Sequence, residues 1–341
     1  MSNVGGSPNI VQMKQEAIVH QDNVNARIHA FCDTTLLKGI AGLKEEFEQL
    51  KPSYFPPAGT FSAFEENSED LKNRFKDVPC LDSTRVVLRD HRESTDYIHA
   101  NYVRTPFSEK RFICTQAPLS TTSYDFWHMI AQELVDNILM LCNFMENGRP
   151  KCARYVPMAA NETLRFEDDI RVTCVQVRPI AIDGANSNST EDLVQRILQV
   201  HKTSDNGSLT HTVTHYQFLA WPDHGVPSSS DLAPLYLLQY IRQTQKPIVV
   251  HCSAGVGRTG SVVAIEYVLE SMIFNQHRED LVEIVRNLRS QRACCVQTES
   301  QYFYVHCILL RFYTEHRYIA ADDPRLLKFL ADYEQATAKR P

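Results

Sequence analysis

The sequence lacks several features that mark secreted or membrane-bound proteins. It contains no run of about 18 consecutive apolar residues, so a membrane span is not expected. The N-terminal segment MSNVGGSPNIVQMKQEAIVH has no apolar core of a signal peptide, and the simple lipidation patterns are missing from both ends. These absences predict a cytoplasmic location.

The sequence also lacks any C-x-x-C spacing among its ten cysteines, so a zinc site is not indicated. Disulfides are rare in a reducing cytosol, and most free cysteines there are small buried side chains. We therefore expect no disulfide framework, metal or cofactor. The question is whether one of the ten cysteines has a different role.

There is no excess of basic residues. The 35 Lys and Arg residues against 41 Asp and Glu residues give a net charge of −6, which argues against a broad nucleic-acid-binding surface. Hydrophobic residues at 43% and charged residues at 22% are typical of globular chains and exclude a disordered, collagenous or coiled-coil protein. A length of 341 residues fits two domains or one large α/β domain.

The order of patterns along the chain favours one α/β domain. Residues 1–34 are polar and are expected to form a flexible extension. An amphipathic helix is predicted from 35 to about 51, and a strand-rich stretch between 163 and 220 predicts an antiparallel meander. We predict a catalytic domain over 35–320, with a twisted mixed sheet flanked by helices, and then a C-terminal helix and tail over 321–341.

The most informative segment is PIVVHCSAGVGRTG at 247–260. Its first part is short, apolar and β-branched, as in a buried central strand. The strand leads into a glycine-containing loop, and the loop opens a long apolar helix. Backbone N–H groups in such a turn, backed by the positive end of the helix dipole, favour an anion.

Cys252 and Arg258 lie at the two ends of this loop. The field that attracts an anion also stabilises a thiolate, so Cys252 is the candidate nucleophile. The planar guanidinium of Arg258 matches two phosphate oxygens. The intervening residues form the candidate phosphate cradle, in which Gly255 and Gly257 supply special backbone angles and room for a ligand: Ser253, Ala254, Gly255, Val256 and Gly257.

Three other interpretations of the loop are weaker. GVGRTG at 255–260 matches the dinucleotide pattern G-x-G-x-x-G, but it falls late in the chain and no alternating series of strands and helices surrounds it. A P-loop would need a Gly-Lys-Ser/Thr sequence, which is absent here. A tight turn with a buried cysteine is the remaining structural alternative.

The motif HCSAGVGRTG at 251–260 resembles the phosphate-binding loop of the tyrosine-specific protein phosphatases. Further segments resemble that family in the family's order and together cover residues 35–315. They are KNRFKD at 72–77 (the recognition loop), DYIHAN at 96–101, TQAPL at 115–119, ENGRPKC at 146–152, WPDHGVP at 221–227 (the acid loop) and VQTESQ at 296–301 (the glutamine loop).

The resemblance implies a role for each matching residue. Asp223 would protonate the leaving phenolate and then activate water as a base, although the residues alone also allow a solvated turn aspartate. Gln297 and Gln301 would position that water. Thr259 would hydrogen-bond the sulfur of Cys252, and His251 would hold the loop and favour the thiolate.

On the recognition loop, Phe75 would stack on the substrate ring, Lys76 would favour acidic neighbours, and Asp77 would accept N–H groups of the substrate peptide. Lys151 would organise the closed acid loop. The sequence departs from the family pattern at four positions, where tyrosine, asparagine, glycine and tryptophan are usual: Phe75, His99, Ala117 and Val156.

The sequence therefore predicts a phosphatase that acts on phosphotyrosine in proteins through a cysteinyl-phosphate, without cofactor, metal or nucleic acid. The alternative is a phosphotyrosine-binding regulator with little turnover, which the four departures motivate. A dual-specificity phosphatase is a weaker variant, because the recognition loop argues for a deep, tyrosine-selective pocket.

Overall fold

The computed structural model describes residues 10–69, 71–89, 95–180, 192–204, 207–222, 225–228, 232–274 and 279–338, with side chains from residue 20 onward. Its main element is a nine-stranded mixed sheet, in the order β1-β2-β3-β11-β4-β10-β9-β8-β7, beside a small β5–β6 hairpin. The strands are β1 (Arg85–Val87), β2 (Tyr97–Thr105), β3 (Ser108–Thr115), β4 (Asn137–Met140), β5 (Met145–Glu146), β6 (Arg149–Pro150), β7 (Thr163–Phe166), β8 (Ile170–Pro179), β9 (Leu193–Ser204), β10 (Gly207–Phe218) and β11 (Ile248–His251).

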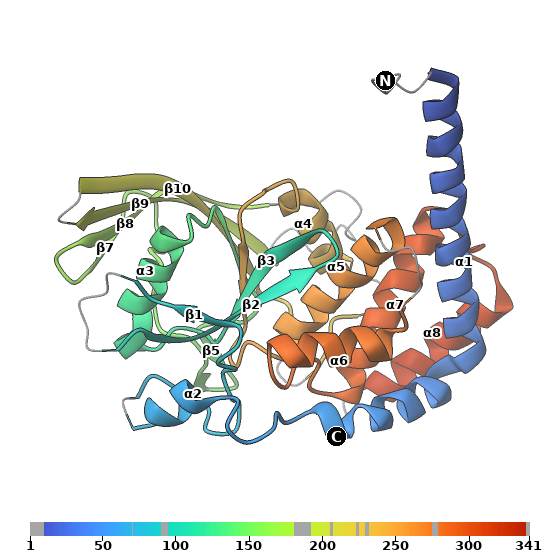
Figure 1. Ribbon diagram of the computed structural model, residues 1–341, viewed down its shortest axis with the longest axis horizontal. Helices are drawn as coiled ribbons and strands as arrows, with labels where there is room; N and C mark the ends of the chain where they lie inside the picture. Colours follow the sequence, from blue (N-terminus) through green and yellow to red (C-terminus); the bar gives the residue numbers. More distant parts are fainter. Residues whose placement is uncertain are drawn as a thin grey trace, which may run out of the picture.

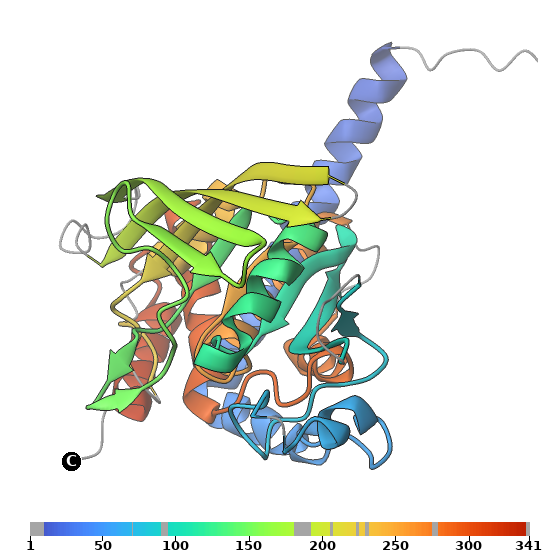
Figure 2. The same cartoon turned by 90° about the vertical axis from the view of Figure 1, so that its left-hand side faces the viewer.

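Strand β11 lies at the centre of the sheet. It pairs in parallel with β3 and β4, and all four of its residues are buried. β-branched residues covered on both faces explain this short apolar run. Strands β7 to β10 form the predicted antiparallel meander, and Figure 2 shows these strands curving around α3.

The helices lie on both sides of the sheet. Helix α3 contacts β7 and β8, whereas α5 contacts β11, β2 and β3, and Figure 1 shows α4 to α8 and α1 gathered away from α3. The helices are α1 (Ile10–Gln49), α2 (Ser62–Glu66), α3 (Ser123–Gln132), α4 (Ala233–Ile241), α5 (Arg258–Phe274), α6 (Leu281–Gln291), α7 (Glu299–Glu315) and α8 (Pro324–Thr337), with short 3₁₀ turns at Lys51–Ser53 and Ser120–Thr122. The predicted mixed sheet flanked by helices is confirmed.

Helix α5 is buried on nearly every side. Its residues from Arg258 to Met272 are all buried, which fits a sequence that is apolar around the whole helix. Helices α4, α6 and α7 and the sheet surround it. The N-terminus of α5, where the cysteine-containing loop ends, is therefore held by the core.

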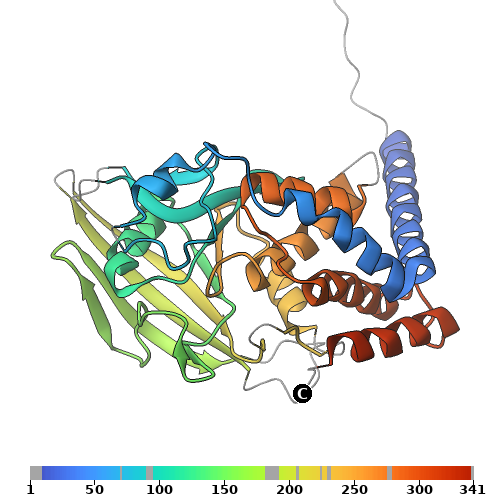
Figure 3. The same ribbon diagram turned by 90° about the horizontal axis from the view of Figure 1, so that it is seen from below.

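Helix α1 differs from the expectation of a flexible segment up to residue 34. The helix begins at Ile10, and its apolar side chains Val24, Ile28 and Phe31 are buried where α1 contacts α7 and α8. Its axis changes direction at Gly39, whose φ of 57° is left-handed. Figure 3 shows the two parts of α1 meeting at this bend. Residues 1–9 lie outside the described part.

Candidate active site

The cysteine loop (residues 252–257) connects β11 to α5 and is held from both sides. The Leu141 N–H donates to His251 O at 2.8 Å, and the Ala117 N–H donates to Ser253 O at 3.0 Å. Within the loop, the Gly255 N–H donates to Cys252 Sγ at 3.3 Å. The sulfur thus lies beside the backbone N–H groups that precede α5.

Gly255 cannot be replaced by another residue without strain. Its φ is +71°, and a Cβ placed there would lie 2.0 Å from Thr115 O, a backbone atom. The loop can therefore approach the end of β3 only because this residue has no side chain.

Arg258 is held by a carboxylate from the β5–β6 hairpin. Its Nη1 and Nη2 donate to Glu146 Oε1 and Oε2 at 2.6 and 2.7 Å, and Nη1 also donates to Leu141 O at 2.9 Å. Burial lowers the pKa of Arg258, but the hydrogen bonds to Glu146 and the negative groups nearby outweigh burial and place this pKa above its ordinary value. The guanidinium is consequently charged and fixed in orientation.

Behind the loop, His251 belongs to a buried polar chain. Its Nδ1 lies 3.3 Å from Cys252 O, and its Nε2 lies 2.7 Å from the hydroxyl of Tyr155. That hydroxyl also lies 2.8 Å from His215 Nε2. Burial lowers the pKa of His251 to about 4 and that of His215 well below its ordinary value, so both rings are neutral near pH 7. Since Cys252 O can only accept, we assign the proton of His251 to Nδ1, and Tyr155 donates to Nε2.

A second buried group, Arg292, connects the cysteine loop to the recognition loop. It donates to Gly255 O at 3.2 Å, to Ala254 O at 3.1 Å and to Asn101 Oδ1 at 2.8 Å. Its Nη2 also lies 3.1 Å from His99 Nδ1, and His99 Nε2 lies 2.8 Å from Val78 O. Because Val78 O must accept, His99 is neutral with its proton on Nε2 and accepts from Arg292.

The recognition loop is fixed at its beginning. Lys72 pairs with the buried carboxylate of Asp125 at 3.2 Å, and Arg74 donates to Ala117 O and Pro118 O at 3.2 and 2.8 Å. Phe75 follows as a partly buried ring that packs against a small apolar cluster. The loop thus presents one aromatic face at a position set by one buried ion pair and by the hydrogen bonds of Arg74 to two carbonyls.

The glutamine loop is closed by a capping box at the start of α7. Gln301 Oε1 accepts the N–H groups of Gln297 and Thr298 at 2.8 and 3.3 Å, and the Gln301 N–H donates to Thr298 Oγ1 at 3.2 Å. Arg289 holds the preceding carbonyls, Cys295 O and Val296 O, at 2.9 Å each. The side chain of Gln301 is therefore held in place, and both Gln297 and Gln301 lie beside the cysteine loop.

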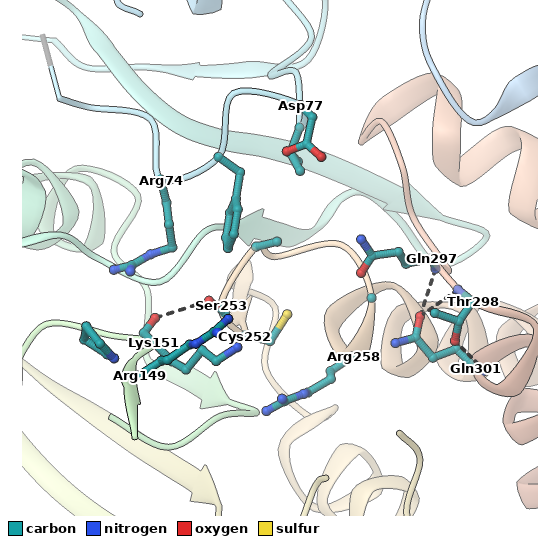
Figure 4. Close-up of a pocket in the computed structure, with 15 residues that line it drawn as sticks. Arg74, Asp77, Arg149, Lys151, Cys252, Ser253, Arg258, Gln297, Thr298 and Gln301 are labelled. Atoms are coloured by element: carbon teal, nitrogen blue, oxygen red, sulfur yellow. Dashed lines mark hydrogen bonds between the residues drawn. The ribbon is translucent and has the colours of Figure 1, made fainter. Parts of the chain in front are cut away.

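These segments surround a cavity of about 510 Å³, shown in Figure 4. Its described lining includes ten of the expected site residues together with five that were not expected. The expected ones are Phe75, Asp77, Lys151, Cys252, Ser253, Ala254, Gly257, Arg258, Gln297 and Gln301. The others are Arg74, Val78, Arg149, Pro150 and Thr298.

Comparison with known proteins agrees with this architecture. Residues 69–311 match the family model described as protein-tyrosine phosphatase. The chain is 33% identical over 290 residues to human tyrosine-protein phosphatase non-receptor type 9, covering 80% of this chain and 46% of that protein. It is 35% identical over 272 residues to the rat non-receptor type 20 enzyme, covering 78% of this chain and 59% of the relative. The chain thus spans about half the length of these relatives.

The chain belongs to the protein-tyrosine phosphatase family. The family prediction is confirmed. Among solved structures, the chain resembles the catalytic domain of human protein tyrosine phosphatase non-receptor type 18, with a TM-score of 0.67, 29% identity and coverage of 80% of this chain and 96% of that one. A structure of that phosphatase in complex with HER2 phosphopeptides is similar, with a TM-score of 0.71, 28% identity and coverage of 84% and 99%.

Not every expected site residue of this chain lines the cavity. Thr259 is fully buried, and its hydroxyl has no hydrogen-bond partner among the described residues. His251 before the loop and Gly255 and Val256 within it are buried and do not line the cavity. Lys76 is exposed and also lies outside the lining. Asp223 lies outside the described residues.

Cys252 is the one cysteine in the described lining of the cavity. All ten cysteines are free and buried. Burial raises the pKa of each of the other nine, to about 12 for Cys152 and about 11 for Cys294. Those nine thiols are therefore expected to be inert near pH 7.

Glu146, Tyr155 and Arg292 hold the site together, and the sequence alone predicted no role for them. Glu146 is the first residue of the ENGRPKC motif at 146–152, and that motif is the sequence signal that could have identified it. Tyr155 and Arg292 reach the loop from distant segments, and no spacing pattern marks them.

Within the described part of the chain, no helix is both long and apolar enough to cross a membrane.

Proposed function

We propose that this chain hydrolyses phosphotyrosine in proteins through a cysteinyl-phosphate intermediate. The observation that carries the proposal is the position of Cys252. Its sulfur lies at the N-terminus of α5, accepts the Gly255 N–H, and shares a cavity with the fixed guanidinium of Arg258. This arrangement suits a thiolate nucleophile that faces a phosphate dianion.

In the first step, Cys252 Sγ attacks phosphorus and the bond from phosphorus to the tyrosine oxygen breaks. Asp223 gives its proton to the departing phenolate. Arg258 and the N–H groups of residues 253–257 hold the phosphoryl oxygens as they flatten into the transition state. The role of Asp223 rests on its place in the acid loop, between Pro222 and Gly225.

In the second step, water attacks phosphorus, Asp223 takes the water proton, and the electron pair of the S–P bond returns to Cys252 Sγ. The unpartnered hydroxyl of Thr259 is available to donate to that thiolate. Gln297 and Gln301 position the water, which their place in the cavity lining supports.

Phe75 selects the aromatic substrate by stacking, and Asp77 and Lys76 contact the peptide at the mouth. The half-buried ring of Phe75 lies in the cavity lining, as a deep pocket for an aryl phosphate requires. That all ten cysteines are free supports a location in a reducing compartment, the cytoplasm. There the chain would act in signalling by removing phosphate from phosphotyrosine-containing proteins.

The departures from the family pattern do not favour the binding-only alternative. His99 makes hydrogen bonds to Arg292 and Val78. Ala117 is buried, and its N–H supports the cysteine loop through Ser253 O. None of these positions removes a group that the two chemical steps need.

The test compares wild type with Cys252→Ser on a phosphotyrosyl peptide. We expect wild-type turnover, an acid-stable phosphoenzyme in quenched samples, and loss of both in Cys252→Ser. Cys174→Ser is the matched control, because Cys174 lies on β8 away from the cavity, and it should retain activity. Tight peptide binding without wild-type turnover would instead support the regulator.

A second variant tests the general acid. Asp223→Ala should lower kcat by about 10²-fold or more while the peptide still binds. Because a phenolate with an electron-withdrawing group needs less protonation, the loss should be smaller for para-nitrophenyl phosphate. Equal losses for both substrates would argue against proton donation by Asp223.

A further inference from the structure

The described lining of the cavity carries an imbalance of charge. Four cationic side chains line it, whereas Asp77 is the one carboxylate in that lining. The cations are Arg74, Arg149, Lys151 and Arg258. A phosphoryl group alone does not explain cations that lie beyond the cysteine loop.

Arg74 and Arg258 already have hydrogen-bond partners within the protein. Both guanidinium nitrogens Nη1 and Nη2 of Arg258 contact Glu146, and Arg74 is bound to two backbone carbonyls. Arg149 differs from both. It is exposed, and within the described part of the chain no carboxylate or carbonyl pairs with its guanidinium.

The hairpin that carries Arg149 is anchored to the cysteine loop. Glu146, on strand β5 of the hairpin, forms an ion pair with Arg258. Lys151 follows strand β6, and its N–H donates to Phe144 O at 2.9 Å. Lys151 O in turn accepts from Ser253 Oγ at 3.4 Å. The backbone position of Arg149 relative to the reacting sulfur is therefore set by hydrogen bonds.

Figure 4 shows Arg149 and Lys151 on one side of Cys252 and Asp77 on another. An acidic group of a bound peptide would be attracted on the hairpin side, whereas on the other side the charge of Asp77 is offset by the adjacent, exposed Lys76. The planar fork of an arginine fits a carboxylate or a phosphate in a bidentate manner. Arg149 on the hairpin side thus offers a guanidinium to a second negative group of the peptide.

We propose, on the basis of the proposed function, that Arg149 and the adjacent Lys151 form a subsite for a second anionic group of the substrate, an acidic or phosphorylated side chain next to the phosphotyrosine. Arg149 makes the direct contact, and Lys151 adds positive charge to the same edge. The subsite acts on the hairpin side of the phosphotyrosine, separately from the peptide contact of Lys76 on the recognition-loop side.

The test uses phosphotyrosyl peptides that differ at one neighbouring position, which is glutamine, glutamate or phosphoserine. A second set carries the change on the opposite side of the phosphotyrosine. For the favoured side, glutamate should raise wild-type kcat/KM over glutamine by about three- to fivefold, a size typical of an exposed charge pair. Phosphoserine, with its greater charge, should raise it further, and the gain should shrink as salt is added.

In Arg149→Ala the gain from glutamate should fall below about twofold. Arg154→Ala is the matched control, because Arg154 is an exposed arginine just after the hairpin that pairs with Glu162 and does not line the cavity. It should keep the wild-type ratio. Equal use of all peptides by wild type, or full discrimination in Arg149→Ala, would overturn the subsite.

Binding separates this inference from the proposed function. The dissociation constants of the same peptides, measured on Cys252→Ser, should show the same ratio and the same loss when Arg149→Ala is added. If wild type failed to turn over even the glutamine peptide, the proposed function would be wrong, and the binding ratios would still decide whether the subsite exists.

Discussion

His99 joins the two sides of the cavity, and replacing it by leucine tests that connection. The wild-type ring is buried, donates to Val78 O at 2.8 Å and accepts from Arg292 at 3.1 Å. Val78 follows the recognition loop directly, and Arg292 holds the carbonyls of Ala254 and Gly255 in the cysteine loop. Leucine keeps an apolar side chain there but makes neither hydrogen bond.

The expected loss follows from those two contacts. His99→Leu leaves Val78 O and one N–H of Arg292 without their partner, and each such group costs about 1–3 kcal/mol when buried. Arg292 Nη2 keeps its bond to Ala254 O, so the free energy of unfolding should fall by about 2–4 kcal/mol. Since both loops lose a support, KM for a phosphotyrosyl peptide should rise more than KM for a small aryl phosphate.

Asparagine, the usual residue of the family at this position, is the conservative control. It offers one donor and one acceptor, so His99→Asn should recover most of the stability and of the peptide KM. Leucine and asparagine are similar in size, but only asparagine can form hydrogen bonds. A difference between the two variants therefore reports the polar contacts and not the change in volume.

The pH dependence gives an independent readout. Burial, and then the charge of Arg292, lower the pKa of His99 to about 3 from the ordinary 6.5. Between these values the unfolded chain binds more protons, so stability falls as the pH falls. At pH 5 this histidine costs wild type about 2 kcal/mol relative to pH 7.5, a loss that neither variant shares.

Urea unfolding at both pH values and steady-state kinetics provide these measurements. Equal stability of His99→Leu and wild type at pH 7.5 would refute the connection. So would the same acid sensitivity in wild type and His99→Asn, because His99 would then not be the buried neutral ring that the hydrogen bonds require.

Three further outcomes are expected. Glu146→Gln removes the charge that faces Arg258 and should lower the free energy of unfolding by about 3 kcal/mol, and an unchanged urea midpoint would contradict this. Gly255→Ala places a Cβ 2.0 Å from a backbone oxygen and should lower the free energy of unfolding by more than about 4 kcal/mol. Gly59→Ala, at a φ of +79° with open space around it, should lower it by about 1–2 kcal/mol. Iodoacetamide should alkylate Cys252 before any other cysteine, and peroxide should inactivate it reversibly; peptide mapping that finds another thiol first would show the opposite.

The cysteine loop could be predicted because its chemistry is local. Cys252 and the cradle lie on one turn directly after β11, and Arg258 begins the next helix, so their spacing alone brings them together. The same holds for the capping box of Gln301 and Thr298. Motifs of this kind record contacts between residues that are close in the chain.

The supports of the loop could not be predicted because their contacts are distant. Arg292 is 37 residues from Gly255, and Tyr155 is 96 residues from His251. Their partners are backbone carbonyls or a buried ring nitrogen, which any sequence offers. Only the three-dimensional course of the chain selects one arginine and one tyrosine for these positions.

The first part of α1 illustrates a different limit. Its buried residues Val24 and Ile28 stand among Asn, Gln and Asp residues, so the apolar stripe is narrow. Most helices gain their stability from packing rather than propensity. Here α7 and α8 supply that packing. Tyr318, in the segment between these helices, donates to Asn25, and Arg325 of α8 pairs with Asp33.

The packing of α7 and α8 also connects to the acid loop. Trp221 at its start packs edge-on against Tyr304 of α7, with ring centroids 5.2 Å apart, and Pro227 O at its end lies 3.5 Å from the hydroxyl of Tyr333 on α8. Helix α7 also carries Gln301 in its first turn and packs on α5. The start of the acid loop, the glutamine loop and the cysteine loop thus share one buried helical layer. The far end contacts α8, which lies beyond residues 69–311 of the family match. Because no α8 residue is part of the described cavity lining, a change in α8 should affect the acid loop before it affects the phosphate cradle.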